Sequence, residues 1–67
     1  MDDVKYPKVK VKLVGEDGNA FAILGRVMGA LRKAGVPKEK IDEFLTEAQS
    51  GNYDHLLQTC MHWVKVR

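Results

Sequence analysis

The stretch that decides the fold is GNAFAILGRVMGALRKAG, residues 18–35. Asn19 is a residue type that caps helix N-termini, and Gly35 stands where helices commonly end on a left-handed residue. Between these two positions, apolar residues recur with the period of about 3.6 residues that is typical of a half-buried helix. The stretch therefore predicts a helix from about Ala20 to Ala34.

Two glycines interrupt this helix, although glycine costs a helix interior about 1 kcal/mol relative to alanine. On a helical wheel, Gly25 and Gly29 share one side with Ala22, opposite an apolar core face. We expect that core face to contain Phe21, Ile23, Leu24, Val27, Met28 and Leu31, with Ala20, Ala30 and Ala34 beside them. Cations border the glycines, and the resulting candidate partner-binding strip is Ala22, Gly25, Arg26, Gly29, Arg32 and Lys33.

Three interpretations of this strip are open. A second element of the same domain crosses closely, so that only small residues fit. Alternatively, a partner chain or a second copy packs there in the same way. In the third interpretation, a phosphate approaches the bare backbone and the neighbouring cations supply the charge.

The segment before this helix, YPKVKVKLVG, alternates strictly between apolar residues and lysines. This alternation predicts a half-buried strand, and Pro7 is tolerated at its start, where an N–H group is dispensable. One face of the strand carries Lys8, Lys10 and Lys12. This lysine face is interpreted as a solvated surface that discourages edge-to-edge aggregation, or else as a basic strip for phosphate.

The second half of the chain predicts two more helices. The first runs from about Pro37 to Gln49 and has an acidic outer face and a narrow apolar stripe of Ile41, Phe44, Leu45 and Ala48. The second follows Asn52, a candidate cap, and its expected buried face is Tyr53, Leu56, Leu57, Cys60, Met61 and Val64. Trp63 falls beside that face, where we expect it to seal the edge of the core.

The tail WVKVR alternates again, and a lone first strand would leave its backbone groups unsatisfied. We therefore predict an α+β fold of order β-α-α-α-β: an N-terminal strand, three helices and a short C-terminal strand, with a small two-stranded sheet packed on the helices. Two alternatives stay open. Either the first strand pairs with its equivalent in a second copy, or residues 63–67 extend the last helix.

Length and composition indicate one small folded domain, residues 1–67. A chain of 67 residues buries only about 60% of its unfolded surface. The hydrophobic fraction of 45%, the charged fraction of 30% and the net charge of +2 are typical of a folded domain without a polycationic tail. The single cysteine, an acidic N-terminus and the absence of a long apolar run predict a soluble protein of the cytoplasm.

No spacing in the chain is typical of catalysis or metal binding. His55 and His62 stand on either side of Cys60 at separations that bring no ligands to one helix face and allow no nucleophilic pair. The loop VGEDGNAF lacks the phosphate-loop patterns, and Glu16 and Asp17 would repel an anion, so we interpret it as a turn. We expect no enzymatic activity, no cofactor and no metal, with Cys60 as a small buried hydrophobe.

The leading functional hypothesis is a small binding or adaptor domain that uses the strip on the first helix to contact a protein partner or a second copy of itself. The alternative is a nucleic-acid-binding protein that uses Lys8, Lys10, Lys12, Arg26, Arg32, Lys33, Lys65 and Arg67. The acidic second helix, the modest net charge and the absence of a base-reading helix argue against this alternative. No membrane role is expected.

The segments DGNAF, GRV, AGV and YDHLL resemble those of a family of small bacterial proteins, some of them encoded on phages and mobile elements. The resemblance extends over residues 11–66. It implies a phage or mobile-element setting and, because the family has no assigned activity, no functional residues.

Overall fold

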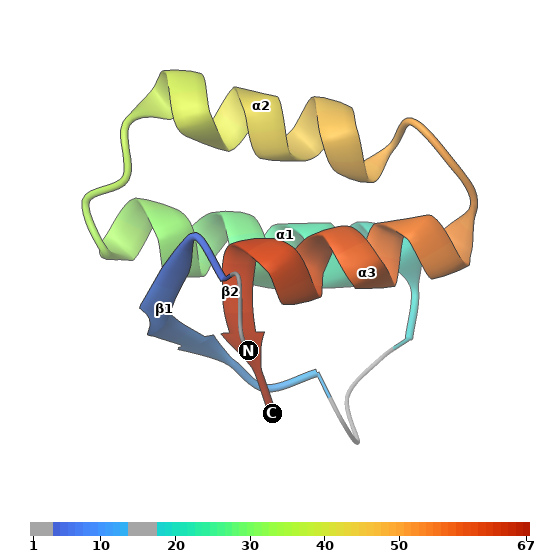
Figure 1. Ribbon diagram of the computed structural model, residues 1–67, viewed down its shortest axis with the longest axis horizontal. Coiled ribbons are helices and arrows are strands. Elements are labelled where there is room, and N and C mark those ends of the chain that lie inside the picture. Colours follow the sequence, from blue (N-terminus) through green and yellow to red (C-terminus); the bar gives the residue numbers. More distant parts are fainter. Residues whose placement is uncertain (1–3, 14–17) are drawn as a thin grey trace.

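The computed structural model describes residues 4–13 and 18–67, and its five elements follow the predicted order (Figure 1). They are β1 (Tyr6–Val11), α1 (Ala20–Lys33), α2 (Lys38–Ala48), α3 (Tyr53–Trp63) and β2 (Val64–Val66). The predicted β-α-α-α-β arrangement is thus confirmed, and the tail forms a strand that follows the last helix directly. The turn expected at Glu16 and Asp17 lies outside the described residues.

Local chemistry sets the ends of the helices. The side chain of Asn19 accepts a hydrogen bond of 2.8 Å from the backbone N–H of Phe21, and Asn52 accepts one of 2.9 Å from that of His55. These bonds satisfy N–H groups that a helix start leaves without partners. Gly35 has a φ of +87°, so the chain leaves α1 through the left-handed conformation that glycine tolerates best.

The two strands form a parallel sheet, which joins residues from opposite ends of the chain. Tyr6 pairs with Val64, Lys10 with Lys65 and Val11 with Val66, with an irregularity between Tyr6 and Lys10. Backbone hydrogen bonds extend the pairing beyond the strands, from Lys5 N to His62 O at 2.8 Å and from Leu13 N to Arg67 O at 3.0 Å. A parallel pair requires a crossover connection, and the three helices supply it.

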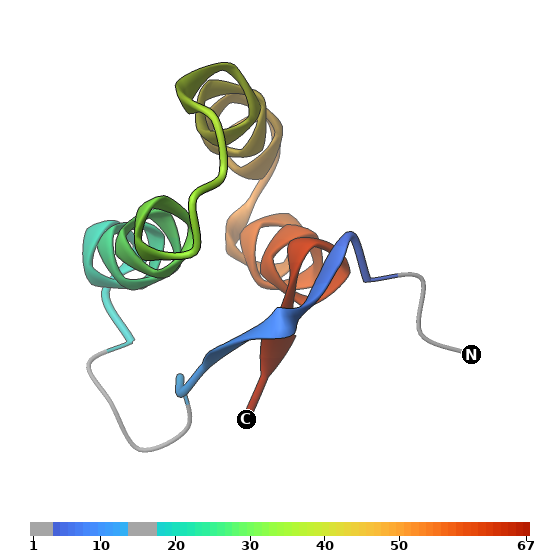
Figure 2. The same ribbon diagram turned by 90° about the vertical axis from the view of Figure 1, so that its left-hand side faces the viewer.

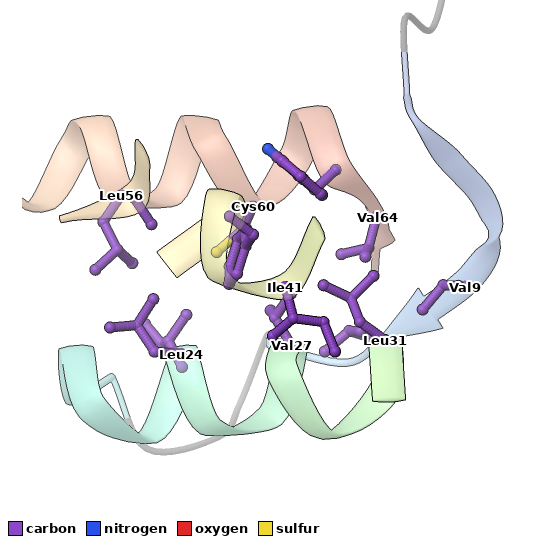
Figure 3. Close-up of a cluster of buried hydrophobic side chains, with 13 residues drawn as sticks. Val9, Leu24, Val27, Leu31, Ile41, Leu56, Cys60 and Val64 are labelled. Atoms are coloured by element: carbon purple, nitrogen blue, oxygen red, sulfur yellow. The ribbon is translucent and has the colours of Figure 1, made fainter. Parts of the chain in front are cut away.

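The helices and the sheet occupy opposite sides of the molecule. Helices α1 and α3 lie side by side, α2 covers them on one side, and the sheet crosses beneath them on the other (Figure 2). The core fills the space between these elements, and Val27, Leu31, Phe44, Ala48, Cys60 and Val64 are completely buried (Figure 3). One side of every element therefore faces the core.

Three residues that were expected in the core are exposed: Phe21 is 81% exposed, Met61 51% and Tyr53 45%. Ala34 is also exposed, and Met28 is only half-buried. The expected faces were too wide, because the other elements of this small domain cover each helix on one side and leave residues at the margins of the apolar faces exposed.

The buried stripe of α3 differs correspondingly from the expected one: it consists of Leu56, Thr59, Cys60 and Trp63. Thr59 can be buried there without an unpaired polar group, because its hydroxyl donates a hydrogen bond of 2.8 Å to the carbonyl oxygen of His55. Tyr53 turns outward and donates from its phenolic hydroxyl to the carbonyl oxygen of Gly18 at 2.6 Å.

Candidate functional site

The strip on α1 faces away from the rest of the domain. Ala22 is half-buried, and all of its other members, Gly25, Arg26, Gly29, Arg32 and Lys33, are exposed. A Cβ atom added to Gly25 or Gly29 would have no atom of the described residues within 4 Å. Within the described residues, no second element crosses closely over the glycines, so the first interpretation of the strip is wrong for this part of the chain. The partner and phosphate interpretations stay predictions.

Phe21 adds an apolar anchor to this surface. It stands one helical turn before Gly25, and its side chain is 81% exposed. The expectation that Phe21 belongs to the core followed from its hydrophobicity and is wrong. On the helical wheel, Phe21 lies at the margin of the apolar face, next to Gly25, and this position was the signal of its exposure in the sequence. We call the combined surface the α1 face; its members are Phe21, Ala22, Gly25, Arg26, Gly29, Arg32 and Lys33.

The α1 face is chemically suited to contact rather than to catalysis. Arg32 and Lys33 lie in the last turn of α1, where positive charge is favoured by the helix dipole. Gly25 and Gly29 leave a stretch of the helix surface without side chains, between Phe21 at one end and these cations at the other. No carboxylate, histidine or cysteine belongs to this face, so it offers no nucleophile and no general acid or base of the usual kinds.

The eight cations of the nucleic-acid alternative separate into two groups. Arg26, Arg32 and Lys33 belong to α1, whereas the other five belong to the sheet region. The five are all exposed: Lys8, Lys10, Lys12, Lys65 and Arg67. We call this second surface the basic sheet face.

Negative charge lies elsewhere in the described part of the chain. There, every Asp and Glu side chain belongs to α2 or to the first turn of α3, namely Glu39, Asp42, Glu43, Glu47 and Asp54. Helix α2 stands on the side of the molecule opposite the strands (Figure 1). The acidity of α2 is therefore no local obstacle to an anion at the sheet.

Cys60 is enclosed in the core. It is completely buried, and this burial raises the pKa of its thiol from 9.0 to about 11. Within residues 4–13 and 18–67, no group of three or more His, Cys, Asp or Glu side chains is placed to hold a metal ion. These features are typical of a packing cysteine rather than of a nucleophile.

His55 joins the end of α2 to α3 and has a structural role. Its Nε2 atom lies 2.9 Å from the carbonyl oxygen of Glu47 and 3.1 Å from Oγ of Ser50. The Ser50 hydroxyl itself donates to the carbonyl oxygen of Glu47 at 2.7 Å. Both side chains therefore satisfy a carbonyl at the end of a helix, and the Ser50 proton points away from the imidazole.

Trp63 seals the core at the junction of three elements, as expected from its place on α3. It is 1% exposed, and its ring contacts Phe44 at a centroid distance of 5.6 Å and Tyr6 at 5.9 Å. The ammonium group of Lys5 lies 4.3 Å from its ring centroid, within cation–π range. Trp63 is consequently unavailable as an anchor for a partner.

No family model, curated protein or solved structure matches this chain. The resemblance to small bacterial and phage-encoded proteins therefore stays a prediction. Within the described ranges, none of the helices has the length and apolar character that crossing a bilayer requires.

Proposed function

We propose that this chain is a non-enzymatic binding domain that contacts a protein partner through the α1 face. The observation that carries the proposal is the placement of an 81% exposed Phe21 beside two glycines with open space above them. Both features lower the stability or solubility of an isolated helix, and both become favourable when a partner covers them.

Each part of the α1 face has a distinct role in such a contact. Burial of the Phe21 ring contributes about 25 cal/mol per Å² of apolar area removed from water, and aromatic residues commonly anchor interfaces. Gly25 and Gly29 allow a partner backbone to approach α1 closely. Arg26, Arg32 and Lys33 form a polar rim that selects the sign of the partner's charge.

The partner that fits this chemistry is an amphipathic helix with an apolar seam and flanking carboxylates. Such a helix would pack against the α1 backbone at Gly25 and Gly29, bury Phe21 and place acidic side chains against the rim cations. The α2 helix of a second copy offers carboxylates to the rim cations but no apolar seam, because Ile41, Phe44 and Ala48 are buried in its own core. A homodimer is therefore a separate outcome of the test below. We further propose a cytoplasmic location, because the lone cysteine is buried and forms no internal disulfide.

Site-specific photocrosslinking in living cells tests the proposal. We expect a photoreactive phenylalanine derivative at Lys33, on the rim of the α1 face, to give one adduct of defined mass, and the same group at Glu39 on α2 to give none. Phe21→Ala should abolish the adduct without changing the thermal unfolding of the chain, since the ring is mostly exposed. An adduct of twice the mass of the chain identifies a second copy as the partner.

Two results would contradict the proposal: equal adducts at positions 33 and 39, or no adduct at position 33. Gly25→Leu and Gly29→Leu provide the complementary test, because the open space lets both variants fold. We expect each of them to remain folded by circular dichroism and to lose the adduct of a reporter placed at Lys33.

A further inference from the structure

One row of side chains on α3 is apolar although it turns away from the centre of the core. Tyr53, Leu57 and Met61 recur at every fourth position, so they lie one above the other on the same side of the helix. Tyr53 is 45% exposed and Met61 51%, and Leu57 between them is half-buried. The outer side of a surface helix is commonly polar. This apolar row is therefore a surface that the described residues leave partly uncovered.

The apolar row borders a hollow between α3, the start of α1 and the ends of both strands. The hollow has a volume of about 320 Å³, and its other walls include Leu13, Ile23 and Val66. Its wall at Tyr53 is fixed, because the phenolic hydroxyl donates a hydrogen bond of 2.6 Å to the carbonyl oxygen of Gly18. Among the described residues, no charged side chain lines the hollow. Whatever fills it must therefore be apolar.

A polar row lies next to the apolar row and carries an acid at its start and a base at its end. It consists of Asp54, Gln58 and His62, which are all exposed and again stand at every fourth position. Asp54 belongs to the first turn of α3 and His62 to the last. The helix dipole favours both placements within one copy, but it does not account for the exposed apolar row beside them. When its direction is reversed, the polar row is complementary to itself.

We propose that α3 docks antiparallel against α3 of a second copy of this chain. A two-fold axis that crosses α3 near Leu57 brings this residue against its equivalent, and it brings Tyr53 against Met61 of the second copy. The two apolar rows then cover each other and the hollows beside them. Asp54 lies opposite His62 of the second copy, where its carboxylate accepts a hydrogen bond from the imidazole.

The charges favour this direction over a parallel pair. A parallel pair places each Asp54 carboxylate against its equivalent, and like charges repel. The outer side of α3 is open to a second copy, since neither α1 nor α2 covers it (Figures 1 and 2). Helix α3 has 11 residues and a length of roughly 16 Å, so the contact is smaller than a standard interface and the dimer is weak. No residue of the α1 face takes part, so this inference does not depend on the proposed function.

Disulfide trapping in a glutathione redox buffer tests the pair, because two cysteines join only when their Cα atoms come within about 7 Å. Cys60 stays in place, since it is completely buried, and the wild-type chain shows that it does not react. Gln58→Cys lies near the two-fold axis, and we expect it to give at least about tenfold more covalent dimer than Glu39→Cys on α2, because pairing raises the effective concentration of its thiols. Mass spectrometry under non-reducing conditions measures the yield.

Two further variants report the direction of the helices. Asp54→Cys and His62→Cys stand eight positions apart, about 12 Å along the helix axis, so an antiparallel pair brings neither thiol to its own equivalent. We therefore expect each variant alone to stay monomeric and an equimolar mixture of the two to form the mixed dimer. The mixed dimer also keeps one Asp54–His62 contact.

Met61→Lys, introduced beside Gln58→Cys, should abolish trapping, because it brings an ammonium group against the apolar row and hollow of the second copy. Phe21→Ala should leave trapping unchanged, so failure of this inference and failure of the proposed function are distinguishable. Thermal unfolding checks that each variant folds, and Met61→Gln takes the place of Met61→Lys if that variant unfolds.

Two results would overturn the inference. The first is a yield for Gln58→Cys within about threefold of that for Glu39→Cys, which means that collision alone joins the thiols. The second is dimerisation of Asp54→Cys or His62→Cys alone as readily as in the mixture, which means that the helices meet in parallel or at random.

Discussion

Glycines in this chain serve different purposes that residue identity alone does not reveal. Gly35 adopts a φ of +87° at the end of α1, so its role is conformational. Gly51 has ordinary backbone angles, but a Cβ placed on it would lie 2.8 Å from Cβ and Cγ of His55. Gly25 and Gly29 have neither constraint. Gly35 and Gly51 are therefore required by the fold, whereas Gly25 and Gly29 are not.

This separation predicts opposite effects of the same substitution. Gly51→Ala should destabilise the domain by about 1–3 kcal/mol, since the new methyl group overlaps the root of a side chain that cannot swing aside. Gly25→Ala and Gly29→Ala should each stabilise it by up to about 1 kcal/mol, because alanine favours the helix and meets open space. Urea denaturation of the three single variants checks the signs. A destabilising Gly25→Ala would mean that this position is packed within the chain.

At the scale of elements, the indole of Trp63 makes one of the polar contacts that join α2 to α3, in addition to the contact of His55 with the Glu47 carbonyl. The indole Nε1 of Trp63 donates a hydrogen bond of 2.9 Å to Oε1 of Glu47, while the Trp63 ring rests on Phe44. Removal of the carboxylate leaves the indole N–H without this partner in a largely buried setting, which costs about 1–3 kcal/mol.

We therefore expect Glu47→Ala to lower the free energy of unfolding by at least about 1 kcal/mol. The helix dipole predicts the opposite sign, since Glu47 lies in the last turn of α2, where negative charge is unfavourable. Glu43→Ala is the matched control, because its exposed ion pair with Lys40 at 3.2 Å contributes less than about 0.5 kcal/mol. Denaturation followed by Trp63 fluorescence measures both variants, and equal effects would exclude the hydrogen bond as the cause.

The elements themselves were predictable because their causes are local. Asparagine caps, a terminal glycine and alternating valines act within a few residues, and each marks an element boundary in the sequence as in the structure. The exposure of Phe21, Tyr53 and Met61 was not predictable, because it depends on how much of each helix the other elements cover. The parallel direction of the strands and the open space above Gly25 and Gly29 likewise depend on the tertiary arrangement, so they could not be predicted from local sequence. The membership of the candidate strip followed from the wheel, but its openness did not.

At the scale of the whole molecule, Cys60 reports on global unfolding. Its thiol is completely buried at the centre of the core, and its pKa is raised from 9.0 to about 11. Between these pH values the thiol ionises in the unfolded chain but stays protonated in the folded one. The unfolded state then binds fewer protons, so stability falls as the pH rises.

We expect the free energy of unfolding to fall by up to about 2 kcal/mol between pH 8 and pH 10.5 through this thiol alone. Cys60→Ala is the control, because it keeps every other titrating group and removes this one. The difference between the two pH profiles, measured by urea denaturation, isolates the contribution of Cys60. Parallel profiles for wild type and variant would show that the thiol ionises equally in both states.

The pairing of β1 with β2 has a consequence for the chain during its synthesis. The ribosome releases Tyr6–Val11 first, yet this strand finds its partner only after Val64–Val66 have left the exit tunnel. Until then Val9 and Val11 lack the strand that pairs with β1 in the folded domain. A product that stops before residue 64 cannot form the β1–β2 pair. The topology thus makes closure of the sheet wait for the synthesis of residues 64–66.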